Sequence, residues 1–160
     1  ISIIRAIPNL PVAVRAGATA LYADKKTNHA SYTLVHSLFS AIGIALTVDK
    51  EEILDSVTAL SGSGPAFVYH IMEAMESAAI TLGLPQQMAT QLTAQTVYGA
   101  ALNAIQCEHS TASLKESVTS ARGTTAAGLA ILQNEDIQTT LQQAILAAYH
   151  RAIEISNDKN

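Results

Sequence analysis

Residues 61–83 read Ser-Gly-Ser-Gly-Pro-Ala-Phe-Val-Tyr-His-Ile-Met-Glu-Ala-Met-Glu-Ser-Ala-Ala-Ile-Thr-Leu-Gly, and this stretch decides the fold class. Its first four residues break the preceding structure, and Pro65 then occupies a position that proline favours, the first turn of a helix. From Pro65 to Leu82 the apolar residues cover more than one stripe of the helix, which predicts burial on several sides. Gly83 ends the helix, because glycine commonly follows a helix C-terminus.

A second long helix is expected directly after the first, beginning at Pro85 and running to about Cys107. Small side chains on this helix allow another helix to approach closely; they are Ala94, Ala100, Ala101 and Ala104. The other expected elements are a strand at 1–4, an extended segment at 12–23, and helices at 28–43, 49–60, 110–118, 125–132 and 135–155. We therefore predict a nearly all-helical domain with two long central helices.

The composition indicates a folded chain that self-associates. At 160 residues the chain is long enough for one domain. Hydrophobic residues make up 49% and charged residues only 14%, against a usual charged share of about 25%. This balance excludes a disordered chain and indicates that part of the surface is covered in an oligomer.

Several function classes are unsupported by the sequence. A net charge of -4 without a basic run argues against nucleic-acid binding. Cys107 is the single cysteine, so no internal disulfide forms, and no signal-peptide pattern is present, which leads us to expect a cytoplasmic protein. Glu73 and Glu76 near the middle of the most apolar helix argue against a membrane span. The histidines lack paired ligand spacing, so no metal site is expected; they are His29, His36, His70, His109 and His150.

Two segments have a composition that suits a small anion. In residues 61–65, glycines and hydroxyls precede a helix whose first amide groups need partners, or the glycines simply permit a tight turn between packed helices. In residues 119–125, four hydroxyls, Arg122 and Gly123 precede another helix. That segment either holds a carboxylate or is an ordinary helix cap made by Thr124 or Thr125 with Arg122 in solvent. Neither segment contains a neighbouring nucleophile and base.

These blocks, taken in order, resemble a known family. The matching stretches are Arg5 to Pro11, Gly17 to Ala20, Leu60 to Ala66, Gly83 to Pro85 and Leu114 to Thr125. The chain from Arg5 to Glu154 is similar to the C-terminal domain of the pyrroline-5-carboxylate reductases, the enzymes that complete proline biosynthesis. Two positions depart from the family pattern: Leu10 stands where threonine is common, and Ala121-Arg122 stands where Pro-Gly is common.

The resemblance implies an enzyme with two domains. An N-terminal Rossmann domain binds NADPH or NADH, and a helical domain dimerises and holds the substrate. Residues 1–11 would be the exit from the dinucleotide domain, and residues 12–160 the helical domain. We expect this chain to be a fragment that is inactive alone and holds no cofactor tightly, and to form a homodimer with interleaved helices or a higher oligomer.

The resemblance also implies a site. Pro8 and Asn9 would lie near the nicotinamide. Thr125 would act as the catalytic residue by hydrogen bonding the ring nitrogen of the imine, and the substrate carboxylate would be bound by the loop residues Val118, Ser120, Arg122, Gly123 and Thr124. The reaction would reduce 1-pyrroline-5-carboxylate to L-proline. Two alternatives stay open: a non-catalytic helical dimerisation module, and a paralogous reductase of another imine or hydroxyacid.

Overall fold

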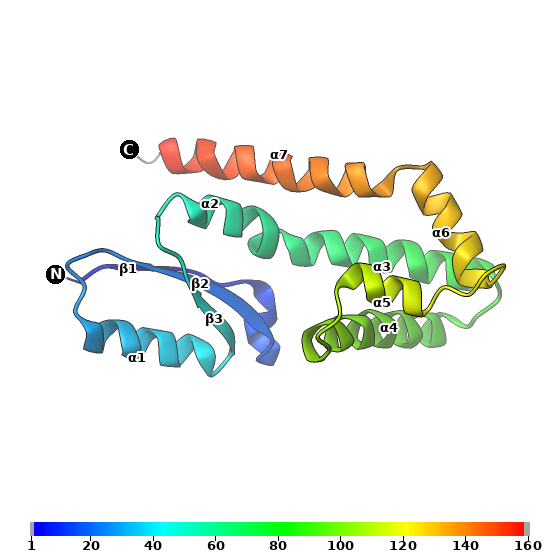
Figure 1. Cartoon of the computed structure of the whole chain (residues 1–160), viewed down its shortest axis with the longest axis horizontal. Coiled ribbons are helices and arrows are strands. Elements are labelled where there is room, and N and C mark those ends of the chain that lie inside the picture. The colour runs from blue at the N-terminus through cyan, green and yellow to red at the C-terminus, as the bar shows by residue number, and fades with distance from the viewer. Residues whose placement is uncertain (1, 159–160) are drawn as a thin grey trace. The chain divides into compact units, whose positions relative to one another are not determined.

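The computed structural model describes residues 2–158, and the chain divides into two compact units (Figure 1). The first, here the sheet unit, comprises the residues up to Phe67 together with those from Gln142 onward. The second, here the helical unit, comprises Val68–Leu141. Two helices contribute to both units, α3 (Gly64–Thr81) and α7 (Ile137–Asn157). Each unit has its own small core.

The sheet unit is built on three strands in the order β1-β2-β3. These are β1 (Ile4–Ile7), β2 (Gly17–Ala23) and β3 (Gly43–Thr47). β1 and β2 are antiparallel, whereas β2 and β3 are parallel. A parallel pair needs a crossover, which α1 (His29–Ser40) supplies. The central strand β2 is buried at Thr19, Ala20 and Leu21, as expected of a strand covered on both faces.

The second face of the sheet is covered by α2 (Ile53–Val57), by a π-helical turn at Thr58–Gly62 and by the end of α7. Leu54, Ala59 and Ala152 are buried there. The Ser156 hydroxyl donates to Asp55 Oδ1 at 2.8 Å, which fixes the end of α7 against α2. This face therefore joins residues that are far apart in the sequence.

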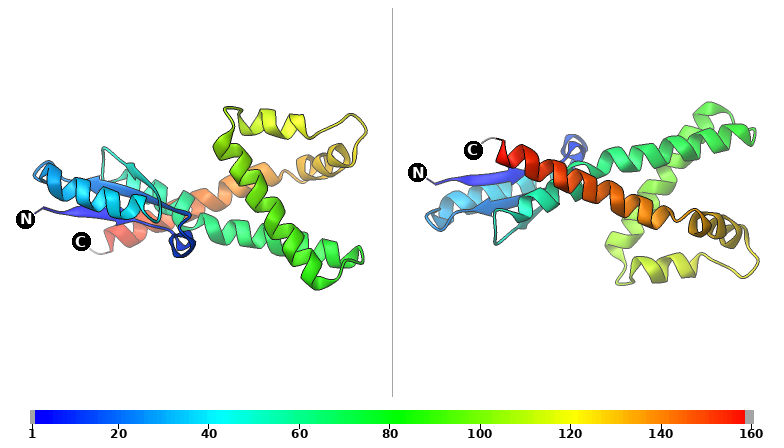
Figure 2. Two further views of the ribbon diagram at one scale, coloured as in Figure 1. Left: turned by 90° about the horizontal axis from the view of Figure 1, so that it is seen from below. Right: turned by 90° about the horizontal axis from the view of Figure 1, so that it is seen from above.

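The helical unit contains most of α3, followed by α4 (Gln86–Gln106), α5 (Thr111–Ser117) and α6 (Thr124–Asn134). In Figure 2, α4 turns back from the end of α3 and then diverges from it. Thr90 on α4 donates its hydroxyl to Glu76 on α3 at 3.1 Å, near this connection. Only Ala89 and Thr93 are buried among the described residues of this unit. Many large apolar side chains stay exposed, among them Met75, Ile80, Leu92, Tyr98, Ile105 and Ile131.

The structure confirms the predicted fold class and its two long helices, and it changes several local assignments. The strand expected at residues 1–4 is β1, which runs from Ile4 to Ile7. A helix was expected to begin at Asp49, but α2 begins at Ile53 because Asp49 to Glu52 form a turn. Gly43 was expected only to end a helix, yet it starts β3 at a φ of 151°. Its missing side chain allows β3 to approach Gly17 on β2, where an added Cβ would overlap the Gly17 backbone.

The extended segment expected at residues 12–23 is also only partly correct. Leu10–Val14 form a short 3-10 helix, and the strand begins at Gly17. The domain boundary at residue 11 stays a prediction. Among residues 2–158, none of the helices is long and apolar enough to cross a membrane.

Candidate functional site

The loop between α5 and α6 contains four of the eight residues predicted to form the site, and two more, Thr124 and Thr125, begin α6. Ser120 to Gly123 form a β-turn that is closed by the Gly123 N–H, which donates to the Ser120 carbonyl oxygen at 3.0 Å. An added Cβ on Gly123 would overlap the Ser120 hydroxyl and lie 3.1 Å from its carbonyl oxygen. Close approach therefore favours glycine at position 123, where the φ of -80° is one that any residue adopts.

The start of α6 presents free hydrogen-bond donors. Gly123 is the N-cap and offers no side chain to the helix, and the first helical bond runs from the Ala127 N–H to the Gly123 carbonyl at 3.2 Å. The amides of Thr124, Thr125 and Ala126 consequently have no helical acceptor. Both threonines are exposed, and neither hydroxyl bonds a partner within residues 2–158. The alternative of a cap made by Thr124 or Thr125 is therefore wrong.

The other hydroxyls of this loop have structural partners. Thr119 donates to the Lys115 carbonyl at 2.6 Å, and Ser117 donates to the Leu114 carbonyl at 2.7 Å. These two bonds satisfy carbonyl groups at the end of α5. Ser120 lies against Gly123 and shapes the turn.

Arg122 adds a positive charge at an unusual backbone position. It is exposed and has a φ of 63°, in the left-handed region that favours glycine. It is the third residue of the β-turn, the position at which type II turns select glycine. Within residues 2–158 its guanidinium forms no ion pair. Together with the helix dipole it makes the surroundings of the α6 N-terminus favourable for an anion.

Val118 borders an apolar recess on the same loop. Its side chain is 64% exposed at the mouth of a cavity of about 310 Å³ between α4 and α5. The cavity is lined by Ala100, Asn103, Ala104, Thr111, Leu114, Lys115 and Val118. Val118, the first residue after α5, is the one residue of the loop that lines this recess.

Pro8 and Asn9 belong to the other unit, at the end of β1. Pro8 is exposed. Asn9 is half-buried, and its carboxamide is engaged within the chain: Oδ1 accepts from the Ala18 N–H at 2.9 Å, and Nδ2 donates to the Ser61 carbonyl at 3.1 Å. The structure brings residues 118–125 together and leaves Pro8 and Asn9 as a separate pair in the sheet unit.

The Ser61–Pro65 segment is neither of the two structures that its composition suggests. It continues the helical path as a π-helical turn in which the Ser63 N–H donates to the Thr58 carbonyl at 2.9 Å. An added Cβ at Gly64 would meet nothing within 4 Å, so close packing does not require glycine there. Because the turn precedes α3 without a break, the segment presents no open helix start for an anion.

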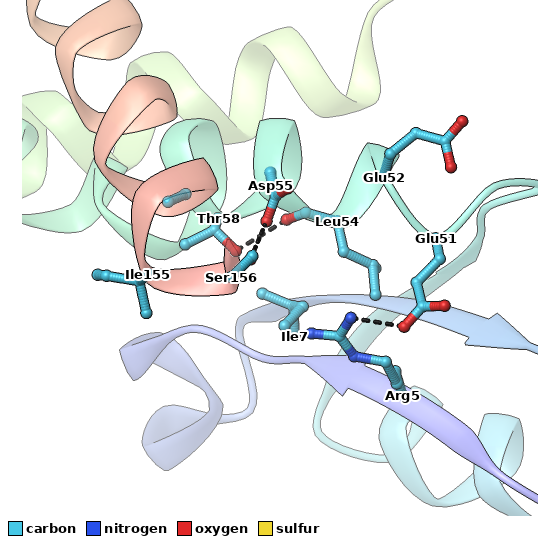
Figure 3. Close-up of a pocket in the computed structure, with 10 residues that line it drawn as sticks. Arg5, Ile7, Glu51, Glu52, Leu54, Asp55, Thr58, Ile155 and Ser156 are labelled. Atoms are coloured by element: carbon cyan, nitrogen blue, oxygen red, sulfur yellow. Dashed lines mark hydrogen bonds and ion pairs between the residues drawn. The ribbon is translucent and has the colours of Figure 1, made fainter. Parts of the chain in front are cut away.

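A cavity of about 720 Å³ lies in the sheet unit and contains none of the predicted site residues (Figure 3). Four of its polar side chains bond one another in pairs. Arg5 pairs with Glu51 at 2.7 Å, and Ser156 donates to Asp55. The one cationic side chain is thereby neutralised, so the cavity offers no free charge to an anion. The local sequence pattern does not predict this cavity, because its walls come from three segments that are distant in the sequence.

The two glutamates of α3, Glu73 and Glu76, have partners close by. Glu73 lies 3.6 Å from His70 Nδ1 and Glu76 accepts from Thr90, so the two carboxylates form a polar strip on α3, not a catalytic pair. No cluster of three or more His, Cys, Asp or Glu side chains suited to a metal ion occurs in the described part of the chain.

The fold is that of a helical domain that follows a small mixed sheet. Residues 51–155 match the family model described as pyrroline-5-carboxylate reductase dimerisation, and the chain belongs to this family. A pyrroline-5-carboxylate reductase of Pseudomonas aeruginosa is 41% identical over 154 residues, which are 96% of this chain and 56% of that protein.

Solved structures of such reductases also resemble the chain. That of a pyrroline-5-carboxylate reductase from Coxiella burnetii has a TM-score of 0.91 and 41% identity, covering 96% of this chain and 57% of the other. The Plasmodium falciparum pyrroline carboxylate reductase, solved with NADP bound, has a TM-score of 0.88 and 30% identity, covering 94% and 60%. The chain spans little more than half the length of these relatives.

Proposed function

We propose that this chain is the dimerising and substrate-binding part of a reductase that converts 1-pyrroline-5-carboxylate to L-proline with NADPH or NADH. The observation that carries the proposal is the α5–α6 connection in a chain of this family. It presents free amides and hydroxyls at the start of α6 and one cation, and its first residue lines an apolar recess. Residues 1–11 lead out of the dinucleotide-binding part, and the helical domain follows. By itself the chain binds no dinucleotide tightly and is inactive.

The loop residues bind and orient the substrate. The amides of Thr124 and Thr125 and the Ser120 hydroxyl hold the carboxylate, and the Arg122 guanidinium adds charge. The Thr125 hydroxyl bonds the ring nitrogen and so fixes the C=N carbon. Val118 and its recess take the apolar edge of the ring. Holding the reacting carbon in place is the chief contribution of the chain, because a correctly placed hydride acceptor needs no covalent catalysis.

Pro8 and Asn9 are the residues of this chain that would face the cofactor. They follow the carboxyl end of β1, and Pro8 is exposed there. The nicotinamide, when bound, supplies the hydride.

Self-association through the helical unit is the second part of the proposal. Two residues of this unit are buried, whereas Ile105 is 80% and Leu82 is 81% exposed. Helices that contact one another so sparsely need a partner to cover their apolar faces. A second copy with interleaved helices meets this need, and the family name supports a dimer.

Ligand binding tests the substrate site on this chain alone. L-Proline added to the purified protein should shift the amide signals of Thr124 and Thr125 in NMR spectra, whereas Thr125→Ala should weaken the binding by about fivefold, the loss expected of one hydrogen bond. Thr119→Ala is the matched control, since that hydroxyl already bonds Lys115. The proposal predicts that this chain, joined to a dinucleotide-binding domain, reduces the imine with NADPH.

The outcomes separate the alternatives. A dimer that binds no cyclic imino acid would be a non-catalytic module, a reading that Arg122 in a glycine position favours. Turnover of a different imine or hydroxyacid would make it a paralogue. Ile105→Glu should dissociate the dimer in sedimentation experiments, whereas Leu38→Glu on α1 should not. A monomeric wild-type chain at micromolar concentration would refute the dimer.

A further inference from the structure

The π-helical turn before α3 contains a carbonyl group that its own helix leaves without a donor. In an α-helix the Ser61 carbonyl would accept the N–H of residue 65. That residue is Pro65, which has no N–H. The next amide, that of Ala66, donates instead to Ser63 at 3.0 Å. The Ser61 carbonyl therefore needs a donor from outside the helix.

Asn9 supplies that donor. Its Nδ2 donates to the Ser61 carbonyl at 3.1 Å, across 52 residues of sequence. Its Oδ1 accepts the Ala18 N–H at 2.9 Å, at the start of β2. The orientation of the carboxamide is fixed chemically, because the Ala18 amide only donates and the Ser61 carbonyl only accepts. One side chain thus joins the end of β1, the start of β2 and the π-helical turn.

We propose that Asn9 is a positioning residue that locks the Pro8–Asn9 segment to the π-helical turn through these two hydrogen bonds. All the groups involved lie in the sheet unit, and Asn9 is half-buried. Asn9 therefore acts on the cofactor side of the reaction through the backbone it holds, with its carboxamide turned inward. The catalytic part of this inference rests on the proposed function, whereas the two hydrogen bonds do not.

Hydrogen exchange of single amides in this chain tests the lock. Asn9→Asp keeps the acceptor for Ala18 but places a carboxylate against the Ser61 carbonyl, and Asn9→Ala removes both bonds. The Ser63 amide, which closes the π-helical turn, should exchange about five- to tenfold faster in both variants, as the loss of one hydrogen bond predicts. The Ala18 amide should exchange faster in Asn9→Ala alone.

Two further variants make the test specific. Asn28→Ala is the matched control, because Asn28 also accepts a backbone amide, that of Ser31, but lies at the start of α1. It should leave the exchange at Ser63 and Ala18 unchanged. Pro65→Ala returns an N–H to the helix, so in Asn9→Asp it should restore slow exchange at Ser63. Unchanged exchange in Asn9→Asp, or no rescue, would overturn the lock.

Kinetics of the chain joined to a dinucleotide-binding domain test the catalytic part. Asn9→Asp should lower kcat by tenfold or more while the KM for the imine changes less than about twofold, since the substrate loop is untouched. Faster exchange with an unchanged kcat would show that Asn9 is structural and would overturn its positioning role. A wild-type protein that oxidises no NADPH would instead refute the proposed function and leave the exchange result standing.

Discussion

Replacing Arg122 with glycine should stabilise the protein, although it removes a charged side chain. The φ of 63° at this position costs an L-residue about 1–2 kcal/mol. Glycine adopts it freely but loses about 0.5–1 kcal/mol more backbone entropy on folding. The difference predicts that the free energy of unfolding rises by about 0.5–1 kcal/mol. Urea unfolding at one fixed protein concentration measures this change, because a self-associating chain has a concentration-dependent stability.

Two controls separate backbone strain from charge. Arg122→Ala removes the guanidinium but keeps a Cβ at the same φ, so it should give no gain. Arg15 has a φ of 59° after the 3-10 helix and is also exposed, so Arg15→Gly should give a gain of the same sign. A loss of stability in Arg122→Gly, or an equal gain in Arg122→Ala, would refute the strain argument and show that the arginine side chain decides the effect.

Three further changes test the sheet unit. Gly43→Ala should lower the free energy of unfolding in urea by about 3 kcal/mol, because its Cβ would overlap the Gly17 backbone at a φ that L-residues avoid. A loss below about 1 kcal/mol would contradict this argument. Leu54→Ala, at a side chain 1% exposed, should cost about 2–5 kcal/mol, and a near-neutral result would refute its core role. Thr27→Val should raise the pKa of Asp24 in an NMR titration, because the Thr27 hydroxyl holds that pKa below 3.8. The stability that this carboxylate contributes to the fold is present above its unfolded pKa and is lost as the pH falls through the folded pKa.

Much of the helical unit is predictable because local chemistry determines where its helices end. Ser110 caps α5 by accepting the Ser113 amide, as its residue type suggests. Gly83 ends the first long helix with a φ of 94°. The α5–α6 turn lacks such a signal, because Ala121-Arg122 stands where the family resemblance leads one to expect Pro-Gly, a turn signature. This chain keeps the positive φ at position 122 with an arginine in place of the glycine.

The elements that the sequence did not predict depend on distant partners. β3 exists because Gly43 approaches Gly17 closely enough to pair with β2, a contact that no local pattern reports. The π-helical turn depends on Asn9, which lies 52 residues away from Ser61. Short-range periodicity therefore favours a plain break at Ser61, where the structure has a helical turn.

The two glycine-rich segments that looked alike in the sequence differ because of what precedes each helix. At Ser61–Pro65 the chain enters α3 already helical, so earlier turns occupy the Ser63 amide and Asn9 satisfies the one orphaned carbonyl. At α6 the chain enters from a β-turn that ends on Gly123, and the first amides of the helix stay open. Composition alone is the same in both cases, glycine and hydroxyls before a helix. The entry path decides which segment can receive a carboxylate, and it selects the α5–α6 loop.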